Sequence, residues 1–96
     1  MPQTSSATLK LVNERGLHAR ASHKFVACAL QFDADIAVTS HNAVCADTVM
    51  ADSVMELLLL GSAFGEEITI KADGPDAAAA VEALSALVKD RFGETQ

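Results

Sequence analysis

Aromatic residues are scarce in this sequence, which has four phenylalanines and neither tryptophan nor tyrosine. Half of its 96 residues are nevertheless hydrophobic. A chain of this length suffices for one small domain with a single core. We therefore expect one domain whose core consists chiefly of alanine, valine, leucine and isoleucine.

Cysteine is also rare, and only Cys28 and Cys45 are present. This is too few for the disulfide framework of a small secreted domain. Neither cysteine has a partner at the spacing of a zinc finger, so no metal site is expected. The simplest interpretation is two small reduced thiols in a reducing compartment, which predicts a cytoplasmic protein.

Basic residues are outnumbered: seven lysines and arginines against thirteen acids give a formal net charge of −6. This charge argues against nucleic acid or an anionic membrane as the partner. No apolar run approaches the roughly 18 residues that would suggest a membrane span, and the first residues do not resemble a signal peptide. We interpret residues 1–6 as a disordered lead, residues 7–92 as the domain and residues 93–96 as a tail.

Apolar residues follow two periods along the chain. Alternation predicts strands, which we place at residues 7–12, 35–40, 44–50 and 67–72. A period of three to four predicts helices, which we place at residues 19–32, residues 53–60 and a segment opened by Gly74-Pro75-Asp76. Pro75 is expected at the first position of the last helix, with Val81, Leu84, Leu87 and Val88 as its core stripe.

The resulting order is β-α-β-β-α-β-α. This order indicates an α+β fold in which helices cover an antiparallel four-stranded sheet. The pattern alone leaves another split β-α-β arrangement open.

The segment Gly16-Leu17-His18-Ala19-Arg20 lies where the first loop meets the first helix. His18 falls at or just before the first turn, whose backbone N–H groups have no acceptor within the helix. These donors and the guanidinium of Arg20 are suited to phosphate oxygens. Because imidazole is a good nucleophile near neutral pH, the combination indicates a histidine that carries a phosphoryl group. The alternative is an ordinary capping or surface histidine, and spacing alone does not decide between the two.

The same segment closely resembles the active-site segment of HPr, the histidine phosphocarrier family of the bacterial phosphoenolpyruvate phosphotransferase system. The resemblance continues in residues 51–61, which are similar to the regulatory-serine helix of that family. It extends through residues 65–70 and the last helix, and so covers the chain from about Ala7 to Phe92.

The resemblance implies an open-faced β-sandwich with strand order 1-4-2-3 and three helices on one face. It also implies that His18 accepts a phosphoryl group on Nδ1 from phosphorylated enzyme I and passes it to a IIA-type protein. The backbone of Ala19 and Arg20, with the Arg20 side chain, would hold the phosphate without a cofactor. Such a protein is a carrier and not a turnover enzyme, and we expect it to be a monomer.

Ser53 is similar to the serine that a dedicated HPr kinase phosphorylates in many relatives. The spacing of Ser53 and Glu56 also matches a capping box, and a helix N-cap by itself explains a serine here. Asp52 and Glu56 would repel a phosphate at this position. The alternative function is therefore a regulatory interaction module of the same fold that is switched at Ser53.

Residues 54–60 contain six apolar residues in seven, although a helix on a sheet buries only one stripe. We expect Leu57 and Leu60 to enter the core. The side chains left over are expected to form a partner docking patch, consisting of Val54, Met55 and Leu58.

Several positions depart from the common HPr pattern. Ala21 replaces a proline, Asp52 and Glu56 replace lysines of well-studied relatives, and residues 40–53 are longer, which predicts a longer hairpin or loop. The acidic character and residues 91–94 look more like the nitrogen-related NPr branch. The sequence leaves open whether the protein serves sugar transport or nitrogen regulation.

His23 and His41 are expected to face solvent without a catalytic role. A small-ligand-binding domain is a further alternative, from a different functional class. It would need a cluster of polar residues to line a pocket, and the sequence contains no such cluster.

Overall fold

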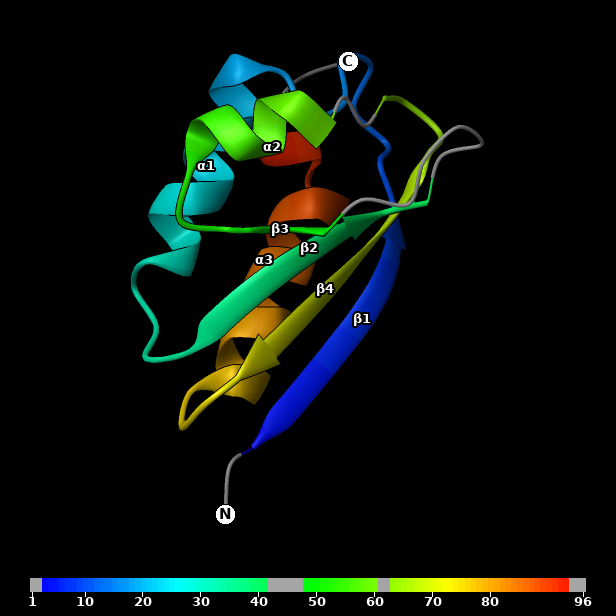
Figure 1. The fold of residues 1–96 in the computed structure, drawn as a ribbon. Helices are drawn as coiled ribbons and strands as arrows, with labels where there is room; N and C mark the ends of the chain where they lie inside the picture. Colours follow the sequence, from blue (N-terminus) through cyan, green and yellow to red (C-terminus); the bar gives the residue numbers. More distant parts are fainter. Residues whose placement is uncertain (1–2, 42–47, 61–62, 94–96) are drawn as a thin grey trace.

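The structure is a computed structural model that describes residues 3–41, 48–60 and 63–93 (Figure 1). Its elements are, in chain order, β1 (Thr4–Lys10), α1 (Ala19–Ala29), β2 (Asp35–Ser40), β3 (Thr48–Met50), α2 (Val54–Leu60), β4 (Glu67–Asp73), α3 (Ala77–Lys89) and a short 3₁₀ turn, η1 (Arg91–Gly93). Among the described residues, no helix has the length and apolarity that crossing a membrane requires.

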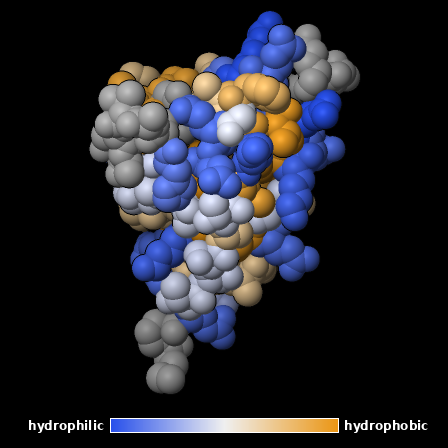
Figure 2. Space-filling view, turned by 90° about the vertical axis from the view of Figure 1, so that its right-hand side faces the viewer, coloured by the Kyte–Doolittle hydropathy of each residue, from blue (hydrophilic) through white to orange (hydrophobic). Residues whose placement is uncertain are grey.

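The four strands form one antiparallel sheet in the order β1-β4-β2-β3. The three helices cover one face of this sheet (Figure 1). This arrangement confirms the α+β class, the strand order and the single helical layer. Seen from the side of the β1 edge, hydrophilic and near-neutral side chains make up much of the surface, with hydrophobic side chains between them (Figure 2).

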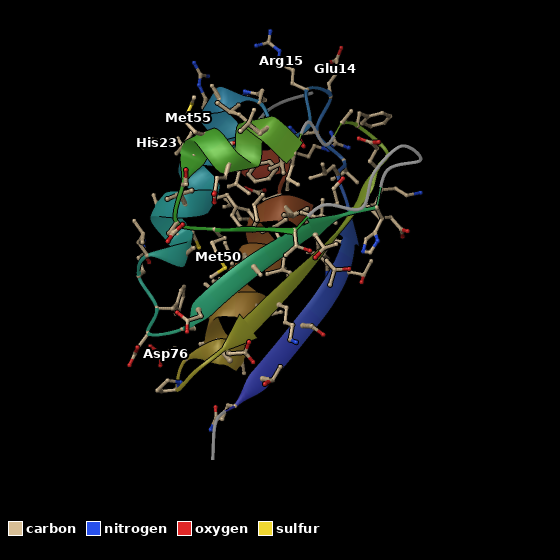
Figure 3. All side chains as sticks on the ribbon, viewed as in Figure 1. Glu14, Arg15, His23, Met50, Met55 and Asp76 are labelled. Carbon is tan, nitrogen blue, oxygen red and sulfur yellow. The ribbon has the colours of Figure 1, made fainter. Side chains whose placement is uncertain are left out.

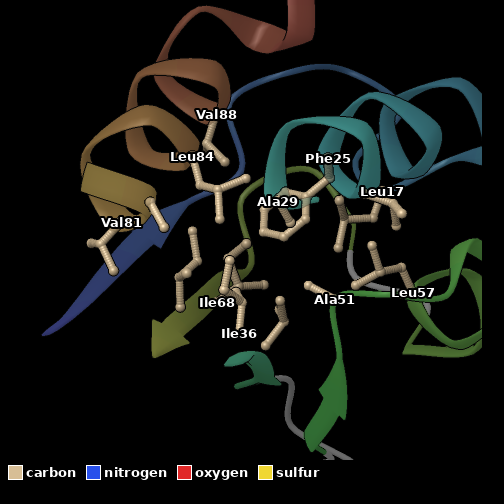
Figure 4. Packing of buried hydrophobic residues seen from close by; sticks show 14 of the residues in the cluster. Leu17, Phe25, Ala29, Ile36, Ala51, Leu57, Ile68, Val81, Leu84 and Val88 are labelled. Carbon is tan, nitrogen blue, oxygen red and sulfur yellow. The ribbon is translucent and has the colours of Figure 1, made fainter. Parts of the chain in front are cut away.

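The core lies between the sheet and the helices (Figure 4). Alanine, valine, leucine and isoleucine supply most of it, with Phe25 and Phe92 as its fully buried aromatic side chains. Leu57 and Leu60 are buried as expected. On α3, the expected stripe is confirmed except at Leu87, which is half-buried at the margin of the core.

Cys28 lies on α1 and is half-buried against the core. Burial raises the pKa of its thiol above the ordinary value, because the charged form is poorly solvated there. The side chain therefore stays protonated and acts as a small apolar residue.

Two boundaries near the start of the chain differ from the sequence prediction. β1 begins at Thr4 and not at Ala7, so part of the expected disordered lead belongs to the sheet. There the Thr4 hydroxyl donates to the Asp73 carboxylate at 2.6 Å. α1 ends at Ala29, because the next residues form tighter turns in which Phe32 N–H donates to the Ala29 carbonyl.

The start of α3 also differs. The helix begins at Ala77, so Pro75 precedes it and does not take its first position. Asp76 does not cap the helix with its side chain. Its carboxylate instead accepts the backbone N–H of Asp33 at 2.8 Å, which ties the start of α3 to the loop before β2. Of the expected third strand, Thr48–Met50 is a strand, while residues 44–47 and Gly61 lie outside the described residues.

Candidate functional site

The loop that precedes α1 closes on itself through the buried Asn13. Its side-chain amide donates to the Gly16 carbonyl at 2.7 Å, and Gly16 N–H donates back to the Asn13 carbonyl at 3.1 Å. Gly16 has a φ of 62°, in the left-handed region that glycine adopts without steric cost. This closed turn positions the residues that lead into α1.

Leu17 and Ser22 fix the chain on both sides of His18. The Leu17 side chain is buried in the core (Figure 4). The buried Ser22 hydroxyl donates to the Leu17 carbonyl at 3.1 Å, and Ser22 N–H donates to the His18 carbonyl at 2.8 Å. Ser22 lies within the helix predicted at residues 19–32, but no pattern in the sequence indicates that its hydroxyl binds the Leu17 carbonyl.

His18 is the N-cap residue of α1, with extended backbone angles of φ −74° and ψ −179°. Its Nδ1 accepts the backbone N–H of Arg20 at 3.3 Å. An accepting nitrogen carries no proton, so a neutral ring with this bond has its proton on Nε2. The electron pair of Nδ1 therefore points toward the first turn of α1.

The first turn of α1, to which this nitrogen is bound, also contains further backbone donors. The N–H groups of Ala19, Arg20 and Ala21 precede the first residue that can donate within the helix, and the positive end of the helix dipole lies there. The side chains of Ala19 and Arg20 are exposed, and His18 is half-buried. The N-cap and first turn of α1 thus contain His18, the backbone donors and Arg20, as the sequence predicted.

α2 lies beside α1 at the same end of the molecule (Figure 1). Met55 of α2 and His23 of α1 both lie toward the end from which Glu14 and Arg15 project (Figure 3). The Ser53 hydroxyl accepts the N–H of Glu56 at 3.3 Å, so the serine caps α2 as the capping box predicts.

The docking patch predicted on α2 is only partly exposed. Met55 is 68% exposed and Leu58 36%, whereas Val54 packs partly against the core. Leu59, which was not included in the patch, is 80% exposed. Leu59 lies two residues after the buried Leu57, which places it on the opposite side of the helix. This spacing could have predicted its exposure from the sequence.

The other two histidines are exposed, as expected. His41 Nε2 lies 2.6 Å from the Thr69 hydroxyl and so belongs to the sheet.

Comparison with known proteins identifies the family of this chain. A family model described as "PTS HPr component phosphorylation site" matches residues 5–90. The chain belongs to the PTS HPr family. Relatives that match this chain over most of their own length are named phosphocarrier protein HPr or NPr, and this membership supports a phosphocarrier role in the phosphotransferase system.

Similar HPr-family proteins come from both branches considered above. The phosphocarrier protein HPr of Neisseria meningitidis serogroup A is 39% identical over 87 residues, which cover 91% of this chain and 93% of that protein. The phosphocarrier protein NPr of Shewanella violacea is 39% identical over 84 residues, which cover 88% of each. A crystal structure of HPr from Thermoanaerobacter tengcongensis has a TM-score of 0.85 at 33% identity and covers 96% of this chain and 99% of that chain.

Replacing Ser22 with alanine should lower the free energy of unfolding by about 1–2 kcal/mol, because the buried Leu17 carbonyl loses its donor. Chemical denaturation measures this change. Ser85→Ala on α3 is the matched control, and we expect it to stay within about 0.5 kcal/mol of the unchanged protein. Equal effects of the two substitutions would show that Ser22 does not anchor the loop.

Proposed function

We propose that His18 accepts a phosphoryl group from phosphorylated enzyme I and passes it to a IIA-type protein. The observation that carries this proposal is the bond from Arg20 N–H to His18 Nδ1, which directs that nitrogen at the start of α1. The protein is then a carrier that is regenerated by its acceptor and not a turnover enzyme. We propose a cytoplasmic location for this relay.

The transfer itself requires no proton movement on His18. Nδ1 supplies its electron pair to phosphorus, while the bond from phosphorus to the donor breaks and its electron pair stays with the donor. Once Nδ1 carries phosphorus, the Arg20 N–H no longer has it as an acceptor and can donate to a phosphate oxygen. The exposed guanidinium of Arg20 adds positive charge that stabilises the phosphate.

A carrier must also give the group away. The phosphoramidate has a high transfer potential, and a partly exposed site holds the phosphate without stabilising it strongly. We propose that donor and acceptor dock in turn on the neighbouring patch of Val54, Met55 and Leu58. Methionine suits such a surface, because its flexible thioether adapts to different partners.

The alternative proposal is a module switched by phosphorylation of Ser53 by an HPr kinase. The Ser53 hydroxyl already caps α2, and the exposed acids Asp52 and Glu56 lie beside it. A phosphate there would add charge next to like charge. The geometry at His18 therefore supports the carrier role better.

The carrier proposal is tested by incubating the protein with phosphoenolpyruvate and the enzyme I of the same organism. Intact mass should increase by one phosphate, and the product should be labile in acid and sensitive to hydroxylamine, as phosphohistidine is. Site mapping should place the phosphate on His18. A stable phosphate on Ser53 as the only product would favour the alternative.

Replacing Arg20 with alanine should slow phosphoryl transfer to and from the protein by about tenfold, the factor that corresponds to 1.4 kcal/mol, because the phosphate loses its nearby cation. The free energy of unfolding should change by less than about 0.5 kcal/mol, since the side chain is exposed. Arg15→Ala removes the same charge from the preceding loop and is the matched control for single-turnover kinetics. If both variants transfer at the unchanged rate, the backbone donors alone hold the phosphate.

A further inference from the structure

A concave surface lies at the end of α1 that is remote from His18. It is a cavity of about 230 Å³ between the end of α1, the start of β2 and the segment that joins β3 to α2. α1 has 11 residues, so the two ends are about 16 Å apart at 1.5 Å per residue. The cavity is therefore separate from the phosphorylation site.

Most residues that line the cavity have apolar side chains, and polar atoms supply about half of its exposed surface. Leu30 is 68% exposed and Met50 41%, and both line it, while Ile36 and Ala51 supply buried walls. The other large hydrophobic side chains that are exposed within the described residues lie on α2 or at Phe64. Leu30 and Met50 thus form an apolar surface distinct from the docking patch of α2.

The charged residues that line the cavity are acidic. Asp35 and Asp52 are exposed residues of its lining, and no lining residue is basic. The negative end of the α1 dipole lies at the same place, and the last turn of α1 has no basic residue to offset it. An occupant that combines an apolar body with a positive end would complement this surface.

The size of the cavity restricts the occupant further. Small-molecule and cofactor sites usually measure roughly 300–1,000 Å³, which is more than is available here. An arginine side chain is smaller than such ligands. Its aliphatic stem packs on apolar surface while its planar guanidinium pairs with carboxylates.

We propose that this cavity receives an arginine side chain of a partner protein. The stem lies between Leu30 and Met50, and the guanidinium pairs with Asp35 and Asp52. A partner bound in this way leaves the His18 end of α1 uncovered. The carrier would then have a second interaction surface, composed of residues other than those of the docking patch.

The test uses backbone amide NMR of the whole protein and a short blocked peptide with one arginine between two leucines. The amide signals of Leu30, Asp35 and Asp52 should shift and saturate with this peptide at millimolar concentration. A peptide with glutamate in place of arginine should leave them unchanged. The Asp35→Asn/Asp52→Asn variant should bind the arginine peptide about tenfold more weakly, because both ion pairs are lost.

Glu82→Gln/Asp90→Asn is the control, since it removes the same charge at exposed positions outside the cavity lining and should bind as the unchanged protein does. Absence of saturable shifts, an equal response to both peptides or equal weakening in the control would overturn the proposal. Shifts of the same amides with protein concentration, without peptide, would overturn it in favour of a second copy of this chain. Phosphorylation of His18 is measured separately, so failure here is distinguishable from failure of the carrier role.

Discussion

Replacing His18 with asparagine should abolish phosphorylation by phosphorylated enzyme I. Asparagine cannot carry the phosphoryl group, but it is a favoured N-cap residue and retains a side-chain acceptor for the first turn of α1. The free energy of unfolding should therefore change by less than about 1 kcal/mol. Intact mass after incubation measures the phosphate, and denaturant unfolding measures the stability.

His23→Asn is the matched control for this substitution. His23 is an exposed histidine of the same helix, and the variant should accept one phosphate at the unchanged rate. Full labelling of the His18→Asn protein would remove the basis of the carrier proposal. Loss of labelling in both variants would show that any substitution of a histidine on or next to α1 prevents phosphorylation, so the loss could not be attributed to the His18 imidazole alone.

Replacing Met55 with glutamate should weaken the binding of enzyme I by more than about 1 kcal/mol, because a charge would then occupy the apolar centre of the interface. Leu58→Glu should act in the same direction. Thermal stability should change little for Met55→Glu, since this side chain is 68% exposed. Titration calorimetry with enzyme I measures the binding.

Leu30→Glu provides the control, because Leu30 is also 68% exposed but lies at the far end of α1. It should leave the affinity for enzyme I unchanged. If the Met55 and Leu58 variants unfold, these residues belong to the core and the docking proposal is wrong. If they bind as tightly as the Leu30 variant, this part of α2 is not an interface.

Much of the fold could be predicted because its signals are local. β2 was expected at residues 35–40 and is found there, since a half-buried strand alternates in polarity. Leu57 and Leu60 were expected in the core because they are three residues apart on one helix. The N-cap position of His18 followed from the loop and the helical period around it.

The remaining features depend on contacts between residues that are distant in the sequence. The bond between Asp33 and Asp76 joins two loops directly before the start of α3. The Lys24 ammonium donates to the Phe92 carbonyl at 2.6 Å, and Phe92 is fully buried with a left-handed φ of 55°. No periodicity in the sequence indicates such pairs, because each needs the tertiary structure to bring its members together.

The cavity between α1 and β2 was also not predicted, because its lining residues come together only in the tertiary structure. Its lining comes from two separate stretches of the chain, residues 29–36 and 50–52, and the sequence shows no cluster of polar residues that would indicate a pocket. Asp35 and Asp52 are far apart in the sequence, so their common position became visible only in the folded chain. The exposed Leu30 was counted within the helix, whereas α1 ends one residue before it.

The central claim is that Nδ1 of His18 is the atom that carries the phosphoryl group. Nitrogen-15 NMR of the imidazole ring in the phosphorylated protein tests it directly, through coupling to phosphorus-31. The account predicts coupling at Nδ1 of His18, with the proton on Nε2. Coupling at Nε2, or at the ring of His23 or His41, would contradict it.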